Sequence, residues 1–207
     1  MKLILIHGLG QTNKSWNNTA DCLAKGTTPL RPGLTDLFIG RERTYNSLYK
    51  GFSEYCGGFS EPVNLCGISL GAVLALNYAA DCPQKVRSLT LIAAQYKTPR
   101  LLMKLQSVIF RFMPEKKFND IGFFKKDFIE LNDSMAKLDL SDKLRNISCP
   151  VLIVCGENDR ANLKASRELS QKLNGARLIV VREAGHEVNI DKPKRLAGLI
   201  NKFLNTL

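Results

Sequence analysis

The segment 63–76 constrains the fold of this chain more than any other stretch. It reads VNLCGISLGAVLAL, so an apolar run ends in the sequence GISLG at 67–71 and continues into an Ala- and Leu-rich helical pattern. This pattern predicts a strand, a sharp turn with Ser69 at its tip, and a helix. Glycines on both sides of such a turn avoid collisions, and the serine backbone is expected to be strained. Ser69 is therefore a candidate nucleophile, with an ordinary helix N-terminal serine as the alternative.

Other apolar runs are typical of strands buried in a parallel sheet. They lie at residues 1–6, 86–94, 151–155 and 177–181. Helical patterns separate them at residues 16–25, 44–55, 70–80 and 162–173, and a last one begins at Pro193. At most a short strand is expected near 28–30, because prolines surround it. The alternation predicts an α/β fold, a three-layer αβα sandwich with a mostly parallel sheet of about six strands.

Residues 97–137 interrupt this alternation. An amphipathic helix is predicted before Pro114, with its apolar face formed by Leu101, Leu102, Leu105, Val108, Ile109 and Phe112. Between 97 and 126 the segment carries eight basic residues and two acidic ones. An apolar face without a strand of its own must cover something, and we expect it to cover the sheet edge above Ser69. Contact with a membrane surface is a second interpretation of the same pattern.

Length and composition favour one domain over residues 1–207. The formal net charge of +11 could attract polyanions, but no nucleic-acid-binding motif is present, and we expect no nucleic-acid partner.

The six cysteines form no C-x-x-C pair and are expected to be reduced. No apolar stretch approaches about 18 residues, and the N-terminal run is too short for a signal peptide. These features predict a cytoplasmic protein without stable membrane insertion, and they leave the oligomeric state open.

The loop after the first apolar run has the sequence HGLGQ at 7–11. It departs from a dinucleotide-binding motif at the third glycine, and the following NKS at 13–15 lacks the glycine of a phosphate-binding loop. A glycine-rich loop at this place can instead present a backbone N–H to a ligand oxygen. We expect His7 to be structural and to hold the loop by hydrogen bonds.

Ser69, Asp159 and His186 each follow an apolar strand closely, in the order nucleophile, acid, base. In a parallel sheet the carboxyl ends of the strands share one edge, so the three side chains can converge. Such a group suits nucleophilic catalysis, because the imidazole removes the serine proton and the carboxylate orients the imidazole.

The acid has competitors in the sequence. Glu157 lies two residues before Asp159, and Asp142 or Asp191 could serve by charge alone. We expect Asp191 to cap the last helix instead.

The motifs at 7–10, 67–71, 156–159 and 185–186 together resemble the α/β-hydrolase fold superfamily over nearly the whole chain. The resemblance implies an oxyanion hole from the backbone N–H groups of Leu9 and Leu70. It also implies that residues 97–140 are an inserted helical cap. The first two strands of the family are missing, so the strand order should be 4-3-5-6-7-8 in the family's numbering.

By this resemblance the chain is a serine hydrolase that cleaves a carboxylic ester through an acyl-enzyme, without metal or organic cofactor. A thioesterase, an acyltransferase or a C–C bond hydrolase could use the same three residues. A binding or regulatory protein that keeps the fold without turnover is the alternative of another class. The identity of the small-molecule substrate is left open.

Overall fold

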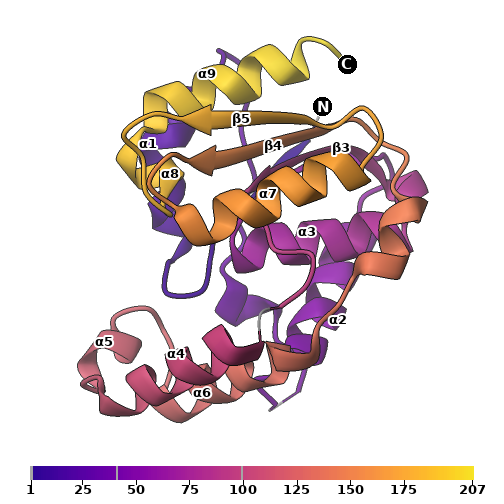
Figure 1. Cartoon of the computed structure of the whole chain (residues 1–207). Helices are drawn as coiled ribbons and strands as arrows, with labels where there is room; N and C mark the ends of the chain where they lie inside the picture. The colour runs from indigo at the N-terminus through magenta and orange to yellow at the C-terminus, as the bar shows by residue number, and fades with distance from the viewer. Residues whose placement is uncertain (1, 41, 99) are drawn as a thin grey trace.

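One parallel sheet of five strands runs through the protein (Figure 1). The computed structural model describes residues 2–40, 42–98 and 100–207, with the side chains of 100–102 and 104–106 outside the description. The strands lie in the order β1-β2-β3-β4-β5, and each pair of neighbours is parallel. Their bounds are β1 Leu3–Ile6, β2 Val63–Ile68, β3 Val86–Ile92, β4 Val151–Gly156 and β5 Arg177–Val181. The predicted α/β architecture is confirmed.

The sheet has one strand fewer than the six predicted. The short strand expected near 28–30 is a single parallel bridge between Leu30 and Ile4. The N–H of Leu30 donates to the carbonyl of Leu3, and the carbonyl of Leu30 accepts from the N–H of Leu5, both at 2.8 Å. Prolines at 29 and 32 flank Leu30 and have no N–H to donate, so the pairing cannot extend into a strand.

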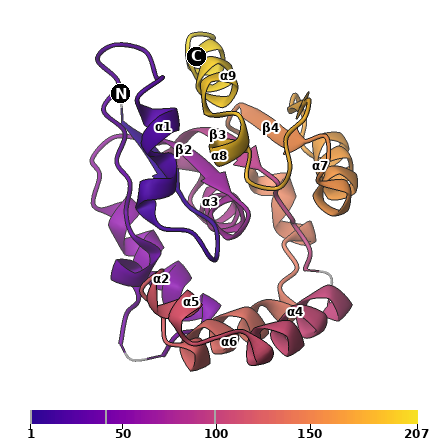
Figure 2. The same ribbon diagram turned by 90° about the vertical axis from the view of Figure 1, so that its left-hand side faces the viewer.

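Helices cover both faces of the sheet (Figure 2). Because successive strand residues point to opposite faces, Leu3 and Leu5 belong to one hydrophobic core, whereas Ile4 and Ile6 belong to the other. The first core packs against α1 Asn17–Ala20, α8 Val188–Asp191 and α9 Pro193–Leu204. The second packs against α2 Tyr45–Gly57, α3 Leu70–Asp81 and α7 Arg160–Lys172. The molecule is therefore a three-layer αβα sandwich.

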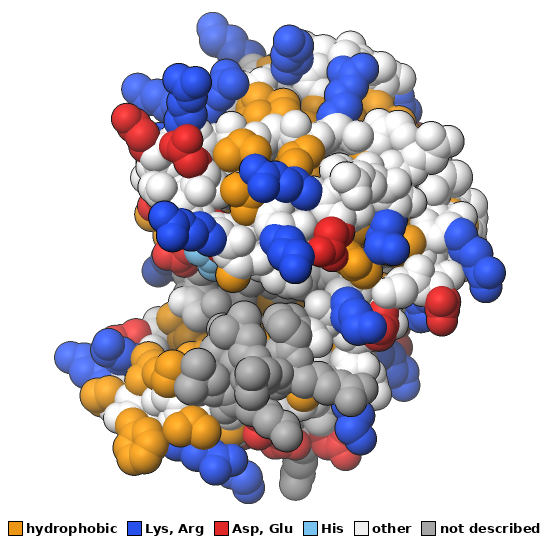
Figure 3. Space-filling model, in the orientation of Figure 1, with side chains coloured by type: hydrophobic (Ala, Val, Ile, Leu, Met, Phe, Trp, Pro, Cys, Tyr) orange, Lys and Arg blue, Asp and Glu red, His pale blue; other side chains and the backbone are white. Residues whose placement is uncertain are grey.

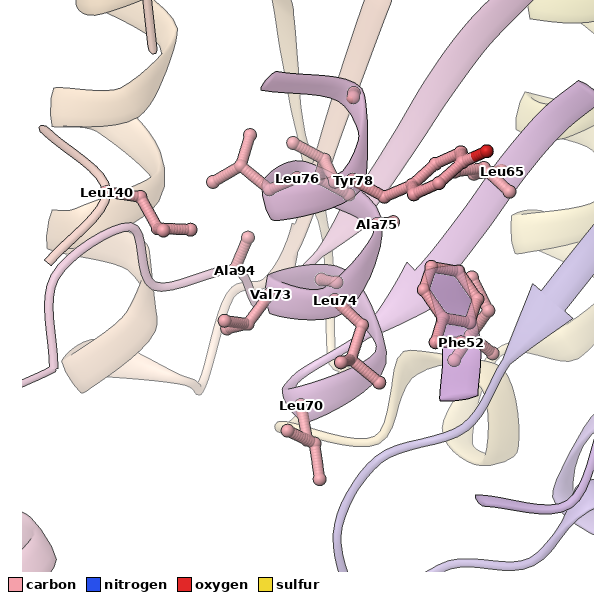
Figure 4. Close-up of a cluster of buried hydrophobic side chains, with 14 of the residues drawn as sticks. Phe52, Leu65, Leu70, Val73, Leu74, Ala75, Leu76, Tyr78, Ala94 and Leu140 are labelled. Atoms are coloured by element: carbon pink, nitrogen blue, oxygen red, sulfur yellow. The ribbon is translucent and has the colours of Figure 1, made fainter. Parts of the chain in front are cut away.

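Helix α3, which follows the turn at Ser69, is buried on every side from Leu70 to Ala80. Figure 4 shows Leu70, Val73, Leu74 and Leu76 extending from it in different directions into the surrounding core. The helix is apolar around its whole circumference, which is typical of a helix enclosed by the protein. Its packing fixes the backbone immediately after Ser69.

The helix predicted over 16–25 is shorter than expected. The chain forms a 3₁₀ turn at Asn13–Trp16, and α1 ends at Ala20. Beyond it, Cys22 and Leu23 donate their N–H groups to carbonyls three residues earlier. These tight turns replace the helix before Gly26, which has a φ of +86°. Further 3₁₀ turns lie at Leu34–Leu37, Pro83–Lys85, Met135–Lys137 and Ser141–Asn146.

The segment 97–140, here called the helical insertion, leaves the sheet after β3 and returns before β4. Its two ends pair with each other through an antiparallel bridge between Lys97 and Asp139, whose side chains form a 3.0 Å ion pair. The N–H of Thr98 also donates to the carbonyl of Leu138 at 2.9 Å. Figures 1 and 2 both show its helices apart from the sheet. They are α4 Arg100–Phe112, α5 Lys116–Asn119 and α6 Lys125–Ser134.

The orientation of α4 differs from the prediction. Val108, Ile109 and Phe112, expected to face inward, are 48%, 50% and 85% exposed. The side chains of Leu101, Leu102 and Leu105, predicted on the same face, lie outside the described residues. Met103 and Ser107 are buried instead. The helix has apolar residues on two faces, and the buried one is fixed by the hydrogen bond from Asn132 Nδ2 of α6 to Ser107 Oγ at 2.6 Å. In the described parts of the chain, no helix has both the length and the hydropathy needed to cross a bilayer.

Candidate active site

Ser69 occupies a strained turn between β2 and α3. Its backbone has φ 53° and ψ −118°, a combination that residues with a side chain rarely adopt. The turn is tight because Gly67 and Gly71 sit against neighbouring backbone. A Cβ on Gly67 would lie 2.3 Å from the carbonyl oxygen of Gly71, and one on Gly71 would lie 2.2 Å from that of Ile6. The predicted strand-turn-helix geometry is present, with the serine half-buried at its tip.

Asp159 and His186 meet at the carboxyl ends of β4 and β5. The loops that carry them are in close contact, since a Cβ on Gly156 would lie 2.0 Å from the carbonyl oxygen of Gly185. His186 Nδ1 lies 2.7 Å from Asp159 Oδ2. The Asp159 side chain is 7% exposed and that of His186 is 43% exposed. A buried carboxylate thus holds one ring nitrogen of a histidine whose other nitrogen points away from it.

The two groups have pKa values shifted in opposite directions. The hydrogen bond to Asp159 raises the pKa of His186 above its ordinary value, although burial acts against this. Burial raises the pKa of Asp159, but hydrogen bonds from His186 and Asn162 outweigh it, so the net pKa is lowered. Each group therefore stabilises the charged form of the other, as expected for an imidazole that must accept a proton.

Sequence reasoning did not single out Asn162 or Gln95. Asn162 Nδ2 lies 2.8 Å and 2.9 Å from the two carboxylate oxygens of Asp159 and 3.1 Å from His186 Nδ1. Gln95 Nε2 in turn donates to Asn162 Oδ1 at 2.8 Å. One signal was available, because Asp159 is the N-cap of α7 and Asn162 is the third residue of that helix, where a side chain can reach back to its cap.

The other candidate acids lie elsewhere. Glu157 is exposed, and its Oε2 accepts from the N–H of Glu183 at 3.1 Å. Asp142 is exposed in the 3₁₀ turn Ser141–Asn146. The expectation that Asp191 caps the last helix is wrong, since its Oδ2 accepts from the N–H of Gly185 at 2.7 Å. Asp191 thereby stabilises the loop that carries His186. This contact forms because the loop folds back on α8.

The loop after β1 lies directly beside Ser69. A Cβ on Gly8 would be 3.3 Å from the Ser69 Cβ, so only a small residue fits there without displacement. His7 is buried, with Nδ1 3.0 Å from the carbonyl of Gly8 and Nε2 3.1 Å from the N–H of Leu34. Burial lowers the His7 pKa. The neutral ring donates through one nitrogen and accepts through the other, which matches the predicted structural role.

Gln11 links this loop to the histidine loop. Its Oε1 accepts from the N–H of Gly8 at 3.2 Å, and its Nε2 donates to Glu187 Oε1 at 2.7 Å. The family resemblance predicts that the N–H groups of Leu9 and Leu70 are oxyanion donors. Neither N–H has a hydrogen-bond acceptor among the described residues. Both residues line the cavity described next.

A cavity of about 550 Å³ lies between the sheet edge and the helical insertion. Ser69 and His186 both line it, together with Asn162. The insertion contributes its most apolar part, including a cluster of rings in which Phe110 and Phe118 each lie 5.0 Å from Phe128 between centroids. The other lining residues of the insertion are Met103, Met113, Ile121 and Met135, with Thr98, Lys117, Asp120 and Asn132 as polar members.

The side chains of Ser69 and His186 at this cavity can carry nucleophilic and acid–base chemistry. Among the described residues, no group of three or more His, Cys, Asp or Glu side chains is arranged to hold a metal ion. All six cysteines carry free thiols.

Residues 3–199 match a family model described as "Alpha/beta hydrolase family". The monoacylglycerol lipase ABHD6 of Mus musculus is 23% identical over 69% of this chain and 48% of its own length. This chain thus spans about half the length of that relative. Pyrrolizixenacetamide deacetylase of Xenorhabdus hominickii is 22% identical over 98% of this chain and 90% of the relative.

Solved structures share the fold over the full chain. An enol-lactonase from Burkholderia xenovorans has a TM-score of 0.83 at 18% identity, covering 99% of this chain and 91% of the other. A thermophilic esterase from Thermogutta terrifontis has a TM-score of 0.78 at 19% identity, covering 100% and 90%. At these low sequence identities, the similarity shows that the proteins share a fold.

Proposed function

Because the chain belongs to the alpha/beta hydrolase family, we propose that it is a serine hydrolase that cleaves a carboxylic ester. Ser69 is the nucleophile, His186 the general base and Asp159 the residue that orients the imidazole. The observation that carries the proposal is the 2.7 Å contact between His186 Nδ1 and Asp159 Oδ2, on a histidine that lines the same cavity as Ser69. A serine hydroxyl is a weak nucleophile without such a base.

The reaction proceeds in two half-reactions. Ser69 Oγ attacks the ester carbonyl carbon while its proton passes to His186 Nε2, and an oxyanion forms on the carbonyl oxygen. The bond from carbon to the leaving oxygen then breaks, and the His186 proton passes to the leaving alcohol. Water then attacks the acyl carbon while His186 Nε2 takes its proton, and the bond from this carbon to Ser69 Oγ breaks. The proton passes from His186 to Ser69 Oγ, which releases the acid and restores the hydroxyl.

The N–H groups of Leu9 and Leu70 stabilise the oxyanion in this proposal. They lack other acceptors among the described residues and come from two elements that meet beside Ser69. Donors fixed by the backbone need no reorganisation as charge develops, which makes them effective in a cavity shielded from water. The neutral His7 and the Gln11 side chain hold the loop that carries Leu9.

The helical insertion acts as a cap in this proposal, within a single domain. It supplies the Met and Phe side chains of the cavity opposite Ser69. An apolar cavity of about 550 Å³ suits a small or medium acyl group or an apolar alcohol. The bridge between Lys97 and Asp139 forms the neck of the cap.

The names of the similar proteins support acyl chemistry, since they include a lipase, an esterase, a lactonase and a deacetylase. Thioester hydrolysis, acyl transfer and C–C bond hydrolysis use the same three groups and are the alternatives within the class. The alternative of another class is a binding protein without turnover. The free thiols fit a reducing compartment, so a cytoplasmic location stays part of the proposal.

A fluorophosphonate probe and a series of p-nitrophenyl esters test the proposal together. The wild-type protein should be labelled covalently, and Ser69→Ala should abolish labelling and lower ester turnover on the order of 10³-fold or more. Turnover should depend on acyl length, because the insertion forms one wall of the cavity. Labelling that persists in Ser69→Ala would move the nucleophile elsewhere. Labelling without turnover of any ester would favour the alternative substrates.

A further inference from the structure

The helical insertion exposes an unusual group of apolar side chains. Val108, Ile109 and Phe112 share one face of α4, and Phe124 immediately precedes α6. Phe112 is 85% and Phe124 is 70% exposed. Among the described residues, only Val180 and Ile190 outside the insertion are large apolar side chains exposed in this way. We call the four side chains on the insertion the insertion patch.

The two parts of the patch lie at the same end of the insertion, because the end of α4 is tied to the start of α6. Lys125 Nζ donates to the carbonyls of Arg111 and Met113, at 2.5 Å and 2.9 Å. These acceptors flank Phe112, and the donor follows Phe124 directly, so both rings belong to the same end of the insertion. The opposite side of α4 is already used, because Met103 and Phe110 line the cavity.

Positive charge surrounds the patch. Arg111, Lys116, Lys117, Lys125 and Lys126 all lie within the segment 111–126, and four of the five are exposed. Within the described residues none of them forms an ion pair with a carboxylate. The segment contains two acids, Glu115 and Asp120. Figure 3 shows hydrophobic side chains next to Lys and Arg side chains at the lower end of the molecule, where the insertion lies.

We propose that the insertion patch docks on the surface of an anionic lipid bilayer. Apolar side chains at one end of a helical segment can enter the boundary between headgroups and acyl chains, while the surrounding cations contact the headgroups. A second copy of the chain fits less well, since a symmetric contact would bring two basic clusters together. Nucleic acid would leave the four apolar side chains without a partner.

Docking would bring the cavity to the bilayer. In the docked state Phe112 faces the lipid, whereas Phe110 of the same helix lines the cavity. A lipid ester would then pass from the membrane surface to Ser69 over a short path. This consequence rests on the proposed function, whereas the docking itself does not. It is therefore tested by binding alone.

Sedimentation with vesicles tests the docking. The wild-type protein is mixed with vesicles of phosphatidylcholine alone or of phosphatidylcholine and phosphatidylserine, and the bound fraction is measured at low and physiological salt. We expect strong binding to the anionic vesicles that weakens with salt, and little binding to the neutral ones. Phe112→Ser combined with Phe124→Ser should lower the binding constant on the order of tenfold or more. Lys116→Gln combined with Lys126→Gln should lower it on the order of fivefold for each charge.

Matched controls use similar side chains elsewhere on the surface. Val180 and Ile190 are 39% and 48% exposed on β5 and α8, and their replacement by Ser should leave vesicle binding unchanged. Circular dichroism and thermal unfolding report that each variant is folded, so the control does not depend on the proposed function. Three results would overturn the proposal: no sedimentation with anionic vesicles, equal loss in the control variant, or a dimer in solution that the Phe112 and Phe124 changes abolish.

Discussion

His186 Nδ1 lies 2.7 Å from Asp159 Oδ2, and each residue shifts the pKa of the other toward its charged form. The Asp159 side chain is buried and receives further hydrogen bonds from Asn162, so it stays ionised where burial alone would favour the neutral acid. An ionised carboxylate fixes the tautomer of the imidazole, with Nδ1 protonated and Nε2 free to accept a proton.

Replacement of the carboxylate should abolish this arrangement. We expect Asp159→Asn to lower kcat on the order of 10²- to 10⁴-fold, because an amide no longer stabilises the protonated imidazole. Glu157→Gln should have little effect, since the remaining carbonyl oxygen can still accept from the N–H of Glu183. Steady-state kinetics on one ester, with circular dichroism as the folding control, compares the two variants. The opposite ranking would assign the acid to Glu157.

The pH dependence should report the raised pKa of His186. The general base must be neutral, so kcat/KM should rise with pH through the pKa of His186, which lies above the ordinary value of 6.5. In Asp159→Asn the main cause of the upward shift is gone. The acidic limb should then move to lower pH while the maximum rate falls. A pH profile whose midpoint stays fixed in the variant would show that another group controls it.

Asn162 and Gln95 should act as positioning residues. Asn162→Ala removes donors to both oxygens of Asp159, and we expect kcat to fall roughly 10- to 100-fold through misorientation of the carboxylate. Gln95→Ala should have a smaller effect in the same direction, because Gln95 acts through Asn162. Asn205→Ala, at an exposed position of the C-terminal segment, is the control. A rise in KM at constant kcat would instead make Asn162 a substrate contact, since it also lines the cavity.

The turn at Ser69 should tolerate no side chain at its glycines. Gly71→Ala places a Cβ 2.2 Å from the carbonyl oxygen of Ile6, and we expect a loss of roughly 1–3 kcal/mol in the free energy of unfolding. Gly198→Ala is the matched control, because this glycine lies in α9 with no atom within 4 Å of an added Cβ. It should stabilise the protein by about 0.5–1 kcal/mol. Urea unfolding measures the free energy of unfolding of both variants. Equal changes in the two would contradict the close approach of Gly71 to the carbonyl of Ile6.

The sequence predicted the elements whose signal is local. The strand-turn-helix at Ser69 and the strand ends before Asp159 and His186 follow from apolar runs and turn residues, whereas the order of the strands was expected from the family resemblance. The sixth strand did not form, because pairing needs donors on consecutive residues and prolines surround Leu30. Whether a strand forms here depends on how many residues can pair with β1, and the strand propensity of single residues does not show this.

Long-range contacts could not be predicted. The Gln95 to Asn162 hydrogen bond joins residues 67 positions apart, and nothing in either local sequence indicates it. The exposed side of α4 was also predicted wrongly. A helix with two apolar faces can bury either, and the choice depends on its contact with Asn132 and Phe128 of α6.

The basic insertion should favour anionic substrates at low salt. Lys117 is exposed and lines the cavity, with the acidic Asp120 close to it in sequence, and the segment around them has a net positive charge. Raising the ionic strength from about 0.01 M to about 0.15 M shortens the Debye length from about 30 Å to about 8 Å. We therefore expect kcat/KM for an anionic ester to fall on the order of tenfold, while a neutral ester of similar size keeps its value.

Two lysine variants identify the source of this salt effect. Lys117→Ala should reduce the salt dependence for the anionic ester, because it removes the cation at the cavity. Lys194→Ala removes an exposed charge from α9, which contributes no residue to the cavity, and should leave the dependence unchanged. If the anionic and the neutral ester show the same salt dependence, the positive charge of the insertion does not select the substrate. It would then serve the binding of the insertion to a charged surface. In that case vesicle binding should remain salt-dependent while turnover of the soluble ester is not.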